Sequence, residues 1–169
     1  FIVEREEALS LVRAAVLVDT RHVDRNQSSL RWDQIPVVVR GGVQHSKVTL
    51  LVRENVIRLV VASANLTTTG YRRNREMAVV FDFFDHADSA PRDLLGEALE
   101  FLREVLQWTA DGPARRRVEE ALDEVGPRSR PWKGMPETSA QNRLPKIGFA
   151  MGWPGRPAGS GRPARPARR

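Results

Sequence analysis

The chain has 169 residues with 27 Lys and Arg, 21 Asp and Glu and a formal net charge of +6, and this length suffices for one domain with a sizeable core. The absence of Cys excludes a disulfide framework and a thiolate metal site, and it fits the reducing cytoplasm, which is the expected location. No apolar run approaches the roughly 18 residues of a membrane-spanning helix, and the opening FIVEREEALS has acids where a secretory leader has basic residues.

The apolar pattern predicts a short helix and then five strands. Leu9 and Val12 stand at helical spacing within residues 4–14. Runs rich in Val, Leu and Ile, bounded by Gly, Asn and polar segments, predict strands over residues 15–20, 35–40, 43–52, 56–63 and 76–83. The third run is apolar at both odd and even positions, which is typical of a strand buried on both faces.

Two helices are expected after the strands. Residues 89–109 carry an apolar stripe, with Ser89 as the expected N-cap and Pro91 in the first turn. Residues 114–125 predict another helix, which Gly126-Pro127 should end. Strands followed by helices indicate the α/β class, here a mixed sheet of about five or more strands flanked by helices, in one domain over residues 1–126.

The last segment, residues 127–169, is basic and rich in Pro, Gly and Arg. Residues 126–169 carry 10 Lys and Arg and one acid, whereas residues 1–125 carry 17 basic and 20 acidic side chains. The same segment holds 8 of the 11 prolines and ends in the low-complexity run GWPGRPAGSGRPARPARR. Such a composition buries too little apolar surface to offset the entropy of ordering, so it predicts a disordered tail, which either contacts phosphates non-specifically or is simply solvated. Trp132 and Trp153 have no clear structural context in it.

Five polar residues interrupt the predicted strands: His45, Lys47, Ser63, Asn65 and Glu76. Residues two apart in a strand share one face, so His45 and Lys47 should project together. If residues 53–55 form a turn, Asn65 comes level with this pair, and Glu76 leads the next strand at the same end of the sheet. Ser63 alternatively bonds its own turn, and Asn74 is expected to be a turn residue.

This set of side chains suits phosphoryl transfer through a covalent phosphohistidine. Neutral imidazole is a competent nucleophile near pH 7, and a carboxylate on its other nitrogen fixes the tautomer. Lys47 and Asn65 would donate to the phosphoryl oxygens. The chemistry requires no metal and no other cofactor. Asp85, His86 and Asp88 superficially suggest a metal site, but they fall in a polar linker, so none is expected.

The motifs HSK, SAN and, later, GYRRNRE resemble one half of the phospholipase D superfamily, whose signature is H-x-K followed by Ser-x-Asn and a later Glu. The resemblance covers about residues 35–83. H-x-K alone is common by chance, whereas the three motifs in this order are specific. The resemblance implies that His45 is the nucleophile and that Lys47 and Asn65 are phosphate ligands. It also implies that Ser63 is a helper and that Glu76 orients His45.

One departure from the family pattern bears on the substrate. Val52 stands where the commonest pattern has Asp, which resembles the tyrosyl-DNA phosphodiesterase branch. The expected substrate is therefore nucleic acid first and phospholipid second. Arg72 and Arg73 beside the proposed site would guide a polyanion inward, or they belong to a solvated loop.

A second departure is that the chain has a single motif. Family active sites combine two motifs, in which one histidine attacks and the other protonates the leaving group. We expect the second motif from a homodimer mate or from a half that precedes Phe1. The rival hypothesis is a non-catalytic half-domain that binds phosphate or nucleic acid, or only completes the fold of a partner half.

Overall fold

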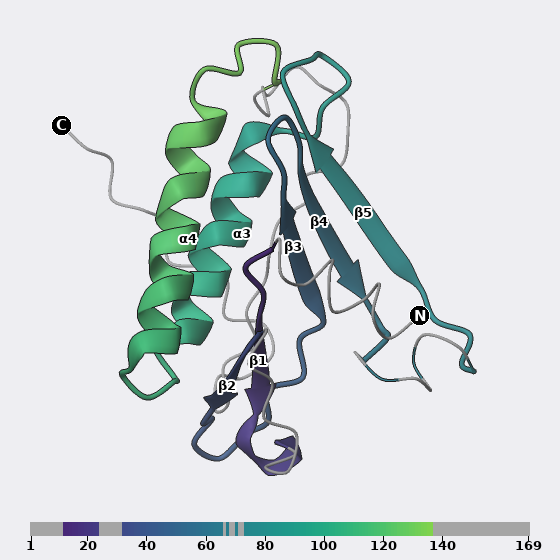
Figure 1. Ribbon diagram of the computed structural model, residues 1–169. Coiled ribbons are helices and arrows are strands. Elements are labelled where there is room, and N and C mark those ends of the chain that lie inside the picture. The colour runs from purple at the N-terminus through teal and green to yellow at the C-terminus, as the bar shows by residue number, and fades with distance from the viewer. Residues whose placement is uncertain (1–11, 24–31, 66, 68–69, 71–72, 137–169) are drawn as a thin grey trace, which may run out of the picture.

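Figure 1 shows the computed structural model of the chain, which describes residues 12–23, 32–65, 67, 70 and 73–136. The elements in these ranges are strand β1 (Ala15–Asp19), a 3-10 turn (Thr20–His22), strands β2 (Asp33–Val37), β3 (Val48–Val52), β4 (Ile57–Ala62) and β5 (Ala78–Phe83), and helices α3 (Arg92–Leu106) and α4 (Pro113–Ser129). The predicted mixture of strands and helices is confirmed. Most of the helix predicted over residues 4–14, and residues 137–169 of the predicted tail, lie outside the described residues.

The strands form two small sheets, so the prediction of a single mixed sheet is wrong. β1 pairs in parallel with β2, while β3, β4 and β5 form an antiparallel sheet in that order. β2 does not join β3 in one sheet. The end of β2 contacts the segment after α3 instead, because Val37 bridges to Thr109 and the Val38 N–H donates to the Trp108 carbonyl (2.9 Å). Residues 38–47 then cross between the sheets outside any strand. Apolar runs predict that strands form but do not fix their partners.

The antiparallel sheet has one covered face and one open face. The covered face packs against α3 and α4 (Figure 1) through the fully buried side chains of Ile57, Leu59 and Phe83. On the open face, Arg58 donates to Asp82 through Nε (2.6 Å) and Nη2 (2.7 Å). Leu51, opposite Arg58, is 47% exposed. The prediction of a third strand buried on both faces is therefore wrong, because the helices cover one face only.

α3 buries the apolar stripe that its sequence predicts: Leu94, Leu95, Ala98, Leu99, Val105 and Leu106. It begins later than predicted, because Pro91 occupies the N-cap position in place of Ser89. Ser89 is buried, and its Oγ accepts from the Phe84 N–H (3.1 Å) and donates to the Ala90 carbonyl (3.0 Å). The hydroxyl thus holds the turn between β5 and α3 rather than capping the helix.

The packed body extends past the boundary that the sequence suggests. α4 continues through Gly126-Pro127, the expected helix end. Beyond it, Trp132 and Met135 are buried in the core, and Arg92 of α3 donates to the Trp132 carbonyl. These contacts outweigh the poor helix propensity of Gly and Pro. Residues 127–136 are thus part of the folded structure.

Candidate functional site

The predicted site residues that the structure describes lie at one end of the antiparallel sheet: His45, Lys47, Ser63, Asn65 and Glu76. His45 and Lys47 lie in the segment just before β3 and not within the strand as predicted. Ser63 and Asn65 follow β4, and Glu76 precedes β5. The ends of three strands therefore deliver these side chains to the same edge.

Backbone hydrogen bonds continue the sheet into this edge. The Ala62 N–H donates to the Lys47 carbonyl (3.0 Å), and the Ser63 N–H donates to the Met77 carbonyl (2.9 Å). At the opposite end of the hairpin, the Arg53 N–H donates to the Val56 carbonyl (2.9 Å). This bond closes the tight turn that the sequence predicts. The short turn sets the register, and the register brings the H-x-K and Ser-x-Asn segments level.

His45 and Lys47 contact each other directly. Lys47 Nζ lies 3.0 Å from His45 Nδ1 and 3.1 Å from Nε2, and it donates to the His45 carbonyl (2.9 Å). An ammonium only donates hydrogen bonds, and a neutral imidazole has one nitrogen with a free lone pair, so the two ring contacts are alternatives. The His45 residue is exposed to solvent. Both ring nitrogens are thus open to a ligand that displaces the lysine.

Glu76 accepts hydrogen bonds from Ser63 Oγ and from Asn74 Nδ2 (3.0 Å). The bond from Ser63, then the bond from Asn74, and also the charge of Lys47 hold the pKa of Glu76 below its usual value. Ser63 Oγ in turn accepts from the Met77 N–H (3.0 Å). Within the described ranges, no hydrogen bond joins Glu76 to His45, so the expected orientation of the histidine by this carboxylate stays a prediction.

Asn74, which the sequence predicts only as a turn residue, also contacts a candidate site residue. Its amide binds the carboxylate of Glu76, two positions along the chain. The N-x-E spacing was the available signal, because residues two apart in an extended segment lie on one face. Asn74 and Ser63 thus fix Glu76 from two sides.

Asn65 sits in a tight backbone turn after β4. Its carbonyl accepts from the Thr67 N–H (2.7 Å), and Thr67 Oγ1 accepts from the Gly70 N–H (3.1 Å). A Cβ on Gly70 would lie 2.5 Å from the Asn65 oxygen and 3.1 Å from its nitrogen. The backbone approach therefore requires glycine at position 70. Asn65 itself is exposed, as a phosphate donor must be.

The structure describes one of the two arginines that are predicted to guide a polyanion. Arg73 is exposed between the Ser-x-Asn turn and Glu76, whereas Arg72 lies outside the described residues. Arg75, the next basic residue, is also exposed. These cations are in water, where their attraction for a phosphate is weak at contact but still steers its approach.

The site is an open surface that gathers the side chains of His45, Lys47, Ser63, Asn65 and Glu76, with the Asn74 amide on Glu76. These groups match the needs of a bound phosphate, which takes donors on its oxygens and a nucleophile in line with the leaving group. Across the part of the chain that the structure describes, no three or more His, Cys, Asp or Glu side chains gather as a metal site would require. At the sequence-suggested cluster, His86 Nδ1 accepts from the Asp88 N–H (3.1 Å), which is a local turn contact.

No family model, curated protein or solved structure matches this chain. The resemblance to the phospholipase D superfamily therefore stays a prediction from the H-x-K, Ser-x-Asn and Glu motifs of the sequence. Of the helices in the described ranges, none is long and apolar enough to cross a membrane.

Proposed function

We propose that this chain is one half of a metal-independent phosphodiesterase of the phospholipase D type. The observation that carries the proposal is the meeting of three spaced motifs at one sheet edge, held there by the backbone bonds from Ala62 to Lys47 and from Ser63 to Met77. The nucleophile is His45. If the H-x-K motif had occurred by chance, there would be no reason for the fold to bring Ser-x-Asn and Glu beside it.

The first step is attack on phosphorus by the lone pair of a His45 ring nitrogen. A nitrogen–phosphorus bond forms, and the bond from phosphorus to the leaving oxygen breaks. Lys47 Nζ, which contacts both ring nitrogens in the free protein, releases the ring and donates to a non-bridging oxygen instead. The Asn65 amide donates to a second such oxygen. These donors stabilise the charge that develops on the phosphoryl group.

The second step returns the histidine to its starting state. A water molecule attacks phosphorus, the nitrogen–phosphorus bond breaks, and a phosphomonoester leaves. The leaving oxygen of the first step needs a proton, and the same acid, now a base, removes a proton from the water. We assign this acid to a second histidine, from a homodimer mate or from another half, because the chain carries a single H-x-K motif.

The substrate class in this proposal is nucleic acid, with phospholipid as the alternative. Val52, at the end of β3, replaces the motif's acid with an apolar side chain. The exposed Arg73 and Arg75 suit a repeating polyanion better than a single headgroup, since each phosphate beyond the reacting one adds a contact. A single-stranded chain would fit an open edge without unwinding.

The second candidate function is a non-catalytic half that binds phosphate. The observation in its favour is that the Glu76 carboxylate is engaged by Ser63 and Asn74, while the His45 ring contacts Lys47. A histidine without an orienting carboxylate binds phosphate through the same donors but attacks it poorly. Binding without turnover would be its signature.

The test is hydrolysis of bis(p-nitrophenyl) phosphate, a single-stranded oligonucleotide and phospholipid vesicles, each with excess EDTA. With a homodimer mate supplying the second histidine, we expect cleavage of the first two, acid-labile labelling of the chain by a ³²P-oligonucleotide, and loss of both in His45→Ala. His86→Ala is the matched control, since His86 is an exposed histidine outside the site. Oligonucleotide binding with neither cleavage nor covalent labelling of the unaltered chain would favour the binding half, and cleavage that survives His45→Ala would refute the mechanism.

A further inference from the structure

Asp19 is a buried carboxylate at the end of β1, in the other sheet from the candidate site. It is 5% exposed. Its Oδ1 accepts from the Arg21 backbone N–H and Nε (both 2.9 Å), and its Oδ2 accepts from Arg21 Nη2 (2.9 Å) and from the Gln44 N–H (2.8 Å). Gln44 immediately precedes His45. One carboxylate therefore ties the residue next to the proposed nucleophile to the end of another sheet.

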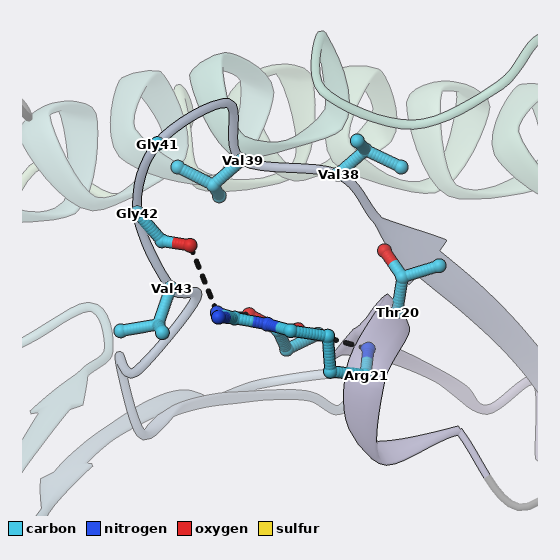
Figure 2. Close-up of a pocket in the computed structure, with 8 residues that line it drawn as sticks. Thr20, Arg21, Val38, Val39, Gly41, Gly42 and Val43 are labelled. Atoms are coloured by element: carbon cyan, nitrogen blue, oxygen red, sulfur yellow. Dashed lines mark hydrogen bonds and ion pairs between the residues drawn. The ribbon is translucent and has the colours of Figure 1, made fainter.

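Arg21 ties the same segment at a second point. Figure 2 shows Arg21 below the loop, where its Nη2 also donates to the Gly42 carbonyl (2.8 Å). The side-chain bonds from Arg21, followed by the backbone bonds from Arg21 and Gln44, hold the pKa of Asp19 well below its usual range. The carboxylate is thus ionised at neutral pH, and both of its oxygens are used.

The loop that carries these two contacts has little packing of its own. Residues 38–43 arch over a cavity of about 510 Å³ (Figure 2), and Val38 and Val43 are each 56% exposed. Gly41, at φ 72°, turns the chain inside the loop. Since burial does not fix the loop, hydrogen bonds must do so: the Val38 N–H holds its start on the Trp108 carbonyl, and the ion pair holds its end.

We propose that Asp19 and Arg21 form a clamp that positions His45 and Lys47. Asp19 holds the backbone N–H of Gln44, and Arg21 holds the Gly42 carbonyl. The inference rests on the proposed function, because it makes both residues positioning residues for the attack by His45. The clamp acts at the entry to the H-x-K segment, and the Ala62 to Lys47 backbone bond acts at its exit. The histidine is thereby held from two sheets at once.

The clamp predicts a specific local response to Asp19→Asn. An asparagine keeps the size of the side chain but loses the charge and one acceptor oxygen, so it cannot accept all four hydrogen bonds from Arg21 and Gln44. The backbone N–H of Gln44 should then exchange its hydrogen at least ~10-fold faster, which is the ratio expected when a charge-assisted hydrogen bond is lost. Arg21→Lys, which keeps the charge but not the fork, should give a smaller increase. Asp82→Asn is the matched control, because it breaks a similar bidentate arginine pair on the open sheet face.

The experiment uses the full chain and reads three quantities for each variant. These are the exchange rate of the Gln44 amide, the ring resonances of His45 by NMR, and kcat and KM with bis(p-nitrophenyl) phosphate. In Asp19→Asn we expect faster exchange, shifted ring resonances and a kcat at least ~10-fold lower with a nearly unchanged KM. In Asp82→Asn we expect none of these changes. Should Asp19→Asn fail to fold, Arg21→Lys carries the same three readouts.

Unchanged exchange and unchanged His45 resonances in the clamp variants would overturn the clamp. Faster exchange with an unaltered kcat would overturn its positioning role. The proposed function fails separately, when the His45→Ala variant hydrolyses the substrate as well as the unaltered chain does. In that case the exchange rates and ring resonances still decide whether Asp19 and Arg21 hold the H-x-K segment.

Discussion

The carbonyl of Lys47 accepts a hydrogen bond of 3.0 Å from the N–H of Ala62, one residue beyond the last paired positions of β3 and β4. This bond extends the hairpin just far enough to set the H-x-K segment beside Ser63. The side chains themselves then project from residues that are no longer inside a strand. The site therefore lies where the regular sheet ends, and its precision depends on the contacts that hold those ends.

Lys47→Ala should weaken both binding and turnover. The ammonium is the closest charged donor to the His45 ring, so its loss removes a phosphoryl-oxygen ligand in the proposed transition state. We expect kcat/KM for bis(p-nitrophenyl) phosphate to fall by about 10²–10³-fold, as when one transition-state donor is removed elsewhere. Lys133→Ala, at an exposed lysine distant in sequence from the site, should leave it unchanged. An equal loss in both variants would indicate a general charge effect.

Ser63→Ala should raise the pKa of Glu76 toward its usual value of 4.5. The hydrogen bond from Ser63 is the largest cause of the lowered pKa, and the bond from Asn74 is second. Because the pKa of Glu76 is lowered in the folded chain, its bonds are present above pH 4.5 and are lost as the pH falls through the lowered pKa. NMR titration of the Glu76 carboxyl carbon measures the change. Asn74→Ala should give a smaller rise, and the reverse order would contradict this ranking.

Gly70→Ala should disturb the turn that presents Asn65. The added Cβ would lie 2.5 Å from the Asn65 backbone oxygen, so the backbone must shift. We expect a loss of about 1–3 kcal/mol of unfolding free energy in urea, the usual cost of forced overpacking. Gly96→Ala is the matched control, because a Cβ there meets nothing within 4 Å on α3. It should stabilise the protein by about 0.5–1 kcal/mol.

Trp132→Ala should destabilise the folded body. Trp132 is 9% exposed and lies in the main core cluster, although it follows the helix-breaking pair Gly126-Pro127. We expect the unfolding free energy to fall by about 3–5 kcal/mol, measured by urea denaturation. Substitution of the neighbouring Lys133 by Ala should change it by less than about 0.5 kcal/mol. A negligible effect of Trp132→Ala would mean that residues 127–136 do not stabilise the fold.

The strands and helices were largely predictable because their signals are local. The apolar run over residues 56–63 gave β4, and the stripe from Leu94 to Leu106 gave the buried face of α3. The ends of elements were less predictable. Ser89 has the chemistry of an N-cap, yet its hydroxyl binds the Phe84 N–H, a contact that the sequence of the helix does not encode.

The gathering of the five polar residues at one end of the sheet was predictable to a similar extent. The five polar residues follow from their spacing, and the tight turn at residues 53–55 allowed the register to be foreseen. The partners of these residues were not foreseen. Asn74 binds Glu76, and the Gln44 amide binds Asp19 from another sheet, 25 residues earlier in the chain.

The sequence by itself determined which residue types are available and which segments are strands or helices, because spacing and apolar periodicity act over a few residues. Only the tertiary structure decided that Val37 of β2 bridges to Thr109 rather than pairing with β3, and that α4 continues through Gly126-Pro127. The same holds for the hydrogen bond from the Gln44 N–H to Asp19. These outcomes depend on contacts between segments far apart in the chain. Their free energy comes from burial and charge pairing that exist only once those segments meet.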